Sequence, residues 1–141
     1  MRTRGQANAR HGQALVEFAL ILPLLMVVLM GIIELGRAWN MKQVLTDAAR
    51  EGARLAVVAD PSLSTSALMT TAVNKHVDSM LARAGMDSTR DRVAFPDGLK
   101  TGTGKTTSVR IAYPFRFLVL QRLANLVQLD SLRTTARMRN E

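Results

Sequence analysis

An uncharged apolar run near the N-terminus constrains this chain of 141 residues more than any other feature. The run covers residues 18–33 and reads FALILPLLMVVLMGII. With its N-terminal neighbours it is long enough, at 1.5 Å per helical residue, to cross a hydrocarbon core of about 30 Å. A chain of this size has no core in which a helix that is apolar on every face could be buried. We therefore expect a transmembrane helix over residues 13–35, between a basic leader at 1–12 and a single domain at 36–141.

The flanking charges predict how this helix is oriented. Arg2, Arg4 and Arg10 precede the apolar run, and basic residues are retained on the cytoplasmic side of a membrane. The leader is then cytoplasmic and the domain extracytoplasmic. A secretory signal sequence is the alternative, because Gly36-Arg37-Ala38 loosely matches a small-x-small cleavage site.

Several functional classes have little support in the composition. The net charge is +8, but beyond the leader the basic residues follow no dense run and match no nucleic-acid-binding motif, so we expect no nucleic acid partner. There are no cysteines. His76 has no histidine near it in the sequence, and no pair of carboxylates is suitably spaced for catalysis. We expect neither an enzyme nor a bound metal or cofactor.

One segment superficially resembles a nucleotide-binding loop. Residues 102–106 read GTGKT, but a P-loop requires a glycine five positions before Gly104, and Leu99 occupies that position. A strand is predicted to follow, whereas a P-loop leads into a helix. The segment is interpreted as a hairpin loop.

An acidic residue inside the apolar segment is the strongest candidate for a functional group. Glu17 is costly at membrane depth unless a partner, protonation or snorkelling compensates it. Gly12 stands five positions earlier, with basic residues before it and an apolar helix after it. This is the spacing of the type IV prepilin cleavage motif, GxxxxE. A glycine before the cut has a physical rationale, because a residue without Cβ enters a peptidase site at little steric cost.

Three stretches extend this motif to a family resemblance. GQALVEFALILPLL, IIELGRAWNMKQVLTDAAREGARLAV and the closing RTTARMRNE together resemble the TadE family (TadE/TadG) of pseudopilins from tight-adherence (Flp-type) pilus systems. The resemblance implies a minor pseudopilin in a bacterial inner membrane, acting in pilus assembly or initiation and present in the membrane or in the pilus itself. It also implies that a prepilin peptidase cuts between Gly12 and Gln13, and that Glu17 pairs with the new amine of a neighbouring subunit.

The implied partners are the prepilin peptidase, other pseudopilins, the major pilin, the inner-membrane assembly platform and the lipid bilayer. Glu17 as a residue that merely snorkels to the interface is the alternative at this position. For the whole chain, the alternative is a membrane-anchored or secreted binding module unrelated to pili. The mature N-terminus distinguishes these readings, since it would be Gln13, about Trp39, or Met1.

The residues after the apolar run predict an α+β, pilin-like domain. The helical period continues to Ala59, with a stripe of mostly small residues that would let a second helix approach closely. Asp60-Pro61 predicts a break, and a second helix follows that ends at Gly85. Alternating patterns predict three short antiparallel strands. The stripe consists of Ala38, Met41, Leu45, Ala48, Gly52 and Leu55. The predicted strands cover residues 92–95, 108–113 and 132–139. The strands need a helix across one face, for which the outer half of the first helix is suited.

A second amphipathic segment lies between the last two strands. Residues 115–129 carry large apolar side chains on one side and polar ones on the other, which predicts a helix. Its apolar side could pack in the core, contact the outer leaflet or bind a partner subunit. That side consists of Phe115, Leu118, Val119, Leu123, Leu126 and Val127.

Overall fold

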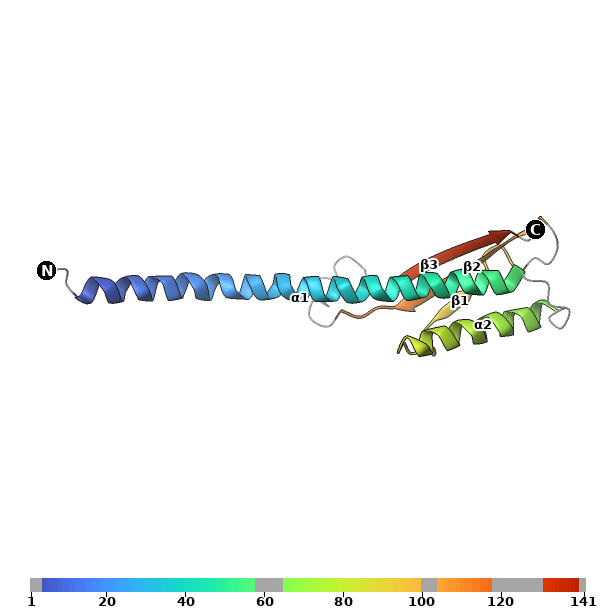
Figure 1. Cartoon of the computed structure of the whole chain (residues 1–141), viewed down its shortest axis with the longest axis horizontal. Helices are drawn as coiled ribbons and strands as arrows, with labels where there is room; N and C mark the ends of the chain where they lie inside the picture. The colour runs from blue at the N-terminus through green and yellow to red at the C-terminus, as the bar shows by residue number, and fades with distance from the viewer. Residues whose placement is uncertain (1–3, 58–64, 100–103, 118–130, 140–141) are drawn as a thin grey trace. The chain divides into compact units, whose positions relative to one another are not determined.

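The computed structural model describes residues 4–57, 65–99, 104–117 and 131–139, with side chains from residue 12 onward. Two helices precede three strands in the order α1 (Arg4–Val57), α2 (Ser66–Arg83), β1 (Arg92–Ala94), β2 (Thr106–Pro114) and β3 (Ser131–Arg139) (Figure 1). The chain divides into two compact units, Met1–Gly36 and Arg37–Glu141. The predicted α+β class, with a long N-terminal helix, a second helix and a small antiparallel sheet, is confirmed.

Helix α1 is continuous through both the apolar segment and the small-residue stripe. Pro23 lies inside it and does not end it, since neighbouring turns can accommodate the lost hydrogen bond of a single proline. The helical period expected after the apolar run is thereby confirmed as far as Val57. The predicted break at Asp60-Pro61 lies outside the described residues.

The sheet is antiparallel in the order β1-β2-β3. Ile111 pairs with Val93 on one side and with Thr134 on the other. The three predicted strands are confirmed, with small differences at their ends. Strand β2 is two residues longer at its start and one residue longer at its end than the alternation predicts, β1 ends one residue earlier, and β3 begins one residue earlier. Because side chains alternate along a strand, the register gives the sheet one buried face and one exposed face.

The core of the second unit is formed by the buried face of the sheet and by both helices. Thr46 of α1 and Thr134 of β3 share a hydrogen bond between their hydroxyl groups at 3.2 Å. The prediction that the outer half of α1 covers one sheet face is therefore confirmed. The buried core residues are Leu45, Ala48, Ala49, Ala53 and Ala56 of α1, Met69, Val73, Val77 and Leu81 of α2, and Val109, Ile111 and Tyr113 of β2.

Gly52 lies where α1 closely approaches its neighbours. A Cβ atom placed on it would lie 3.3 Å from a methyl group of Val73, 3.3 Å from one of Val77 and 3.6 Å from one of Val109. Distances near 3.3 Å are tighter than ordinary van der Waals contact. The small residues of α1 thus allow α2 to pack closely, as the sequence predicts.

Helix α2 ends where glycine punctuation predicts. Gly85 has φ of 72°, and its N–H donates to the Ala82 carbonyl at 3.0 Å while the Met86 N–H donates to the Leu81 carbonyl at 2.9 Å. These two bonds form a Schellman motif, in which glycine takes the left-handed position at no steric cost. At the other end, Met69 is buried in the core and Leu68 is 51% exposed.

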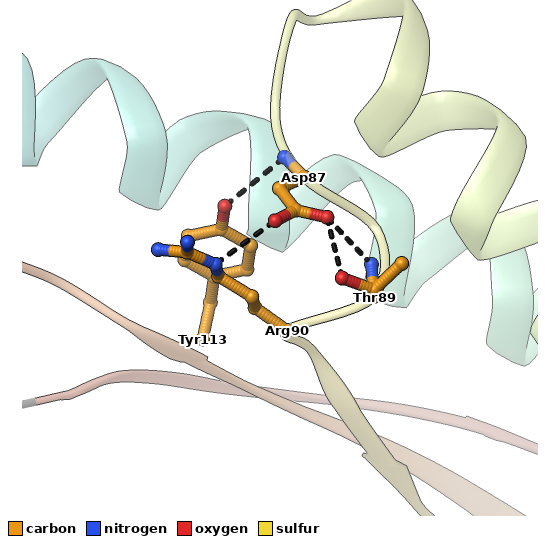
Figure 2. A network of polar contacts seen from close by, with 4 residues as sticks. All are labelled: Asp87, Thr89, Arg90 and Tyr113. Atoms are coloured by element: carbon orange, nitrogen blue, oxygen red, sulfur yellow. Dashed lines mark hydrogen bonds and ion pairs between the residues drawn. The ribbon is translucent and has the colours of Figure 1, made fainter.

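A polar network ties the connection between α2 and β1 to the sheet. The Asp87 backbone N–H donates to the Tyr113 hydroxyl at 3.1 Å. The Asp87 carboxylate accepts hydrogen bonds from the backbone N–H and hydroxyl of Thr89 at 3.1 and 2.6 Å, and it pairs with Arg90 Nε at 2.9 Å (Figure 2). This is an Asx-type turn, in which a carboxylate replaces the backbone acceptor. It fixes the position at which the chain enters β1.

We expect this turn to make the domain sensitive to acid. Hydrogen bonds from the Thr89 side chain and backbone, with the nearby charge of Arg90, lower the pKa of Asp87 below its usual 3.8. A carboxylate with a depressed pKa stabilises the fold above the unfolded-state pKa, and this stabilisation is lost as the pH falls through the folded-state pKa. Asp87→Asn should therefore have a lower melting temperature than wild type at neutral pH. The difference should shrink steadily below pH 3.8, and a pH-independent difference would contradict the assignment.

Candidate functional site

The predicted cleavage position lies inside α1. Gly12 and Gln13 both have helical backbone, and a Cβ atom placed on Gly12 would meet nothing within 4 Å. A peptidase would have to unwind this turn to bring the peptide bond into an extended site. Glycine lowers the free energy of that step, because it favours the helix by about 1 kcal/mol less than alanine does.

The glutamate of the motif is exposed on the same helix. The Gln13 side-chain amide donates to Glu17 Oε1 at 3.2 Å, one turn along α1. This contact is an ordinary i,i+4 pair and leaves the second carboxylate oxygen of Glu17 available. The structure thus places Gly12, Gln13 and Glu17 within two turns of each other on an exposed helix surface.

The helix around this motif exposes large apolar side chains on all its faces. Leu20 is 74% exposed, and most of the large apolar residues from Leu15 to Leu35 are also exposed. Of the helices that the structure describes, α1 is the one long and apolar enough to cross a membrane. An exposed apolar surface of this size is typical of a membrane or protein contact. The observation is consistent with membrane anchoring near the N-terminus.

The segment at residues 115–129 is only partly described. Phe115 follows β2 without regular structure and is 4% exposed. Its ring packs edge-on against Phe117 at 4.9 Å between centroids, and the Arg37 guanidinium lies 5.6 Å from its centroid. Phe115 is therefore a buried contact between the end of β2 and α1. Residues 115–117, the start of the predicted helix, are not helical. The rest of that segment, with Leu118, Val119, Leu123, Leu126 and Val127, lies outside the described residues.

Two titratable side chains of the second unit, His76 and Asp91, are partly buried. His76 is half-buried on α2, and its Nε2 atom is buried without a hydrogen-bond partner among those residues. Asp91 is half-buried, and burial followed by the nearby Asp78 carboxylate raises its pKa. Across the described ranges, no three histidine, cysteine or acidic residues are grouped as metal ligands.

The exposed face of the sheet carries a group of arginines that the sequence analysis missed. Basic residues that follow no dense run along the chain are brought together by strand pairing. The signal was the alternation of arginine with other residues in β3, which places every second side chain on one face. We call this surface the arginine face, and it consists of Arg92, Arg110, Arg133, Arg137 and Arg139.

Comparison with known families finds a match over most of α1. Residues 12–54 match the family model described as TadE-like protein. No curated protein and no solved structure matches the chain. The match begins at Gly12 and includes the whole apolar run and the small-residue stripe as far as Gly52, whereas Leu55 and the closing stretch RTTARMRNE lie outside it. The resemblance to the TadE-like family is confirmed over these residues.

Proposed function

We propose that this chain is a minor pseudopilin that helps to assemble or initiate a tight-adherence pilus after a prepilin peptidase removes residues 1–12. The observation that carries the proposal is the TadE-like match beginning at Gly12, on an exposed apolar helix with Glu17 five positions further on. Its role is non-covalent, through contacts with other pseudopilins, the major pilin and the assembly platform in the membrane.

Leader removal would supply the charge that compensates Glu17. Cleavage after Gly12 creates an ammonium group at Gln13, one helical turn from the Glu17 carboxylate. An ammonium and a carboxylate each lose solvation in lipid, and the free-energy cost of placing them there is smaller when they are paired than when they are separate. The amine of one subunit can pair with Glu17 of the next, because Glu17 is exposed and its contact with the Gln13 amide is readily exchanged.

The arginines before the span support a cytoplasmic leader and an extracytoplasmic domain. In this orientation the Gly12-Gln13 bond lies at the cytoplasmic end of the membrane helix. Residues 37–141 would then be presented to other pilus subunits on the outer side of the inner membrane.

We expect Glu17→Leu to insert in the membrane at least as well as wild type and yet to lose its association with partner pilins. Leucine removes a desolvation cost of a few kcal/mol for a carboxylate in lipid, but it also removes the acceptor for the neighbouring amine. The measurement is the amount of partner pilin that co-purifies with the tagged chain in detergent, together with pilus counts.

Glu17→Asp serves as the graded control, because it keeps the charge and shortens the side chain by one methylene. We expect it to give intermediate recovery of partners. Wild-type recovery with Glu17→Leu would show that the carboxylate is a bystander at the membrane interface. No association of the wild-type chain with any subunit of the pilus system would contradict the proposed function itself.

A further inference from the structure

On the exposed face of the sheet, arginines alternate with smaller residues both along and across the strands. At one level across the strands, the register aligns Arg92 of β1, Ala112 of β2 and Arg133 of β3. At the next level it aligns Ala94, Arg110 and Thr135. Adjacent strands lie about 4.8 Å apart, so Arg92 and Arg133 originate about 10 Å apart on either side of a small residue.

This arrangement leaves a hollow on the surface between the two outer arginines. The hollow has a volume of about 320 Å³. Ala112 lies between Arg92 and Arg133 in the register and also lines the hollow, and its side chain is a single methyl group. The residues that line the hollow are Arg90, Arg92, Ala112, Pro114, Ser131 and Arg133.

The positive charge around the hollow is only partly compensated. On the same face, Arg137 is paired with Asp97 at 4.0 Å. Arg90 is paired with Asp87 at 2.9 Å, and Arg110 makes only a weak hydrogen bond to the Thr135 hydroxyl at 3.4 Å. Over the described ranges, Arg92 and Arg133 have no acidic partner within 4 Å. Like charges within a Debye length of about 8–10 Å repel each other, and an anion between them removes this repulsion.

We propose that the arginine face is a docking surface for an acidic segment of a neighbouring pilus subunit, whose carboxylates enter the hollow between Arg92 and Arg133. The proposal rests on the proposed function. Guanidinium groups bind carboxylates through two parallel hydrogen bonds, which fixes orientation as well as charge. Acidic side chains two positions apart on a strand, or four apart on a helix, have a spacing that two such arginines can engage.

The side chains between the arginines favour a protein partner over nucleic acid or lipid. Ala94, Ala112 and Thr135 separate the arginines at the two levels described above. They offer no aromatic ring on which a base could stack. They also offer no large apolar group that could insert among acyl chains. A flat polar surface with spaced guanidinium groups matches the rim of a protein interface, where charge sets partner choice and association rate.

The decisive comparison is between two double variants of equal net charge in the full-length chain, produced in cells that carry the pilus system. Arg92→Gln/Arg133→Gln removes two charges from the hollow, and Arg50→Gln/Arg83→Gln removes two exposed charges from the helices. We expect the first to reduce co-purified pilus subunits about tenfold and the second to leave them unchanged. Equal recovery with both variants would overturn the proposal.

A second measurement identifies the contacting group. Arg133→Lys keeps the positive charge and introduces an amine that a carbodiimide couples directly to a carboxylate in contact with it. Mass spectrometry should then find position 133 joined to an aspartate or glutamate of another pilus subunit. Retained co-purification without this cross-link would place the contact elsewhere and overturn the proposal.

Two further comparisons test lipid and nucleic acid as alternative ligands and distinguish failure of the docking surface from failure of the proposed function. Wild type could bind phosphatidylglycerol vesicles or duplex DNA, and Arg92→Gln/Arg133→Gln could lose this binding without any change in subunit recovery. This result would assign the arginine face to lipid or nucleic acid and overturn the proposal. If Glu17→Leu loses its partners and the arginine variant keeps them, the pseudopilin role stands and the docking surface alone is wrong. If wild type recovers no subunits, both fail.

Discussion

Gly52→Leu is expected to lower the free energy of unfolding of the second unit by about 2 to 3 kcal/mol, the upper part of the range for overpacked cores. The first added carbon already lies 3.3 Å from methyl groups of Val73 and Val77, so the remaining three carbons have no space unless α2 moves away from α1. For a domain of this size the melting temperature should fall by about 10 °C or more. Circular dichroism of the full-length chain in detergent, with hydrogen exchange of the β2 amides, measures the change.

Two substitutions in the same helix provide the controls. Gly36→Leu makes the same change where a Cβ atom meets nothing within 4 Å, so it should not destabilise the fold. Gly52→Ala adds one carbon in tight contact, and its gain in helix propensity of about 1 kcal/mol should offset much of the cost. A Gly52→Leu protein as stable as wild type would mean that α1 and α2 do not pack as described.

The helices of this fold were predictable because the constraints on them are local. A period of 3.6 residues identifies the buried stripe of α1. The small residues Ala48 and Gly52 predict that another element packs closely against this stripe, although they do not identify that element. Gly85 marks the end of α2 because few residues other than glycine take positive φ readily. Which of the two adjacent apolar residues Leu68 and Met69 is buried is not decided locally. It depends on the rotation of α2 against α1, which only packing decides.

The arginine face shows what sequence reading does not resolve. Arg92, Arg110 and Arg133 are far apart in the chain and follow no shared local pattern, and they become neighbours only through the pairing of β1, β2 and β3. The bond from the Asp87 N–H to Tyr113 spans 26 positions and has the same origin. Within β3 the alternation of arginines was visible, but which side of the strand would be buried depends on where α1 packs.

The proposed cleavage motif, unlike the arginine face, can be predicted from the sequence, because a peptidase would recognise a short continuous segment. We expect Gly12→Leu to abolish removal of the leader in cells with the cognate prepilin peptidase. A Cβ atom at Gly12 meets nothing within 4 Å in the structure, so leucine leaves the chain's own packing intact. The substitution instead adds bulk next to the scissile bond and favours the helical turn that must unwind, by up to about 1 kcal/mol. Mass spectrometry of the N-terminus of membrane-extracted protein provides the measurement.

Each possible mature N-terminus indicates a different kind of N-terminal processing. Wild type should begin at Gln13, and Gly12→Leu should retain Met1, while Gly36→Leu should be processed like wild type because its change lies far from the motif. A wild-type chain beginning near Trp39 would indicate a secretory signal instead, because cleavage there follows Gly36-Arg37-Ala38. Normal removal of residues 1–12 from Gly12→Leu would show that the glycine is not read by the peptidase. In that case the helix around Glu17, and not the residue before the cut, would have to position the bond for cleavage.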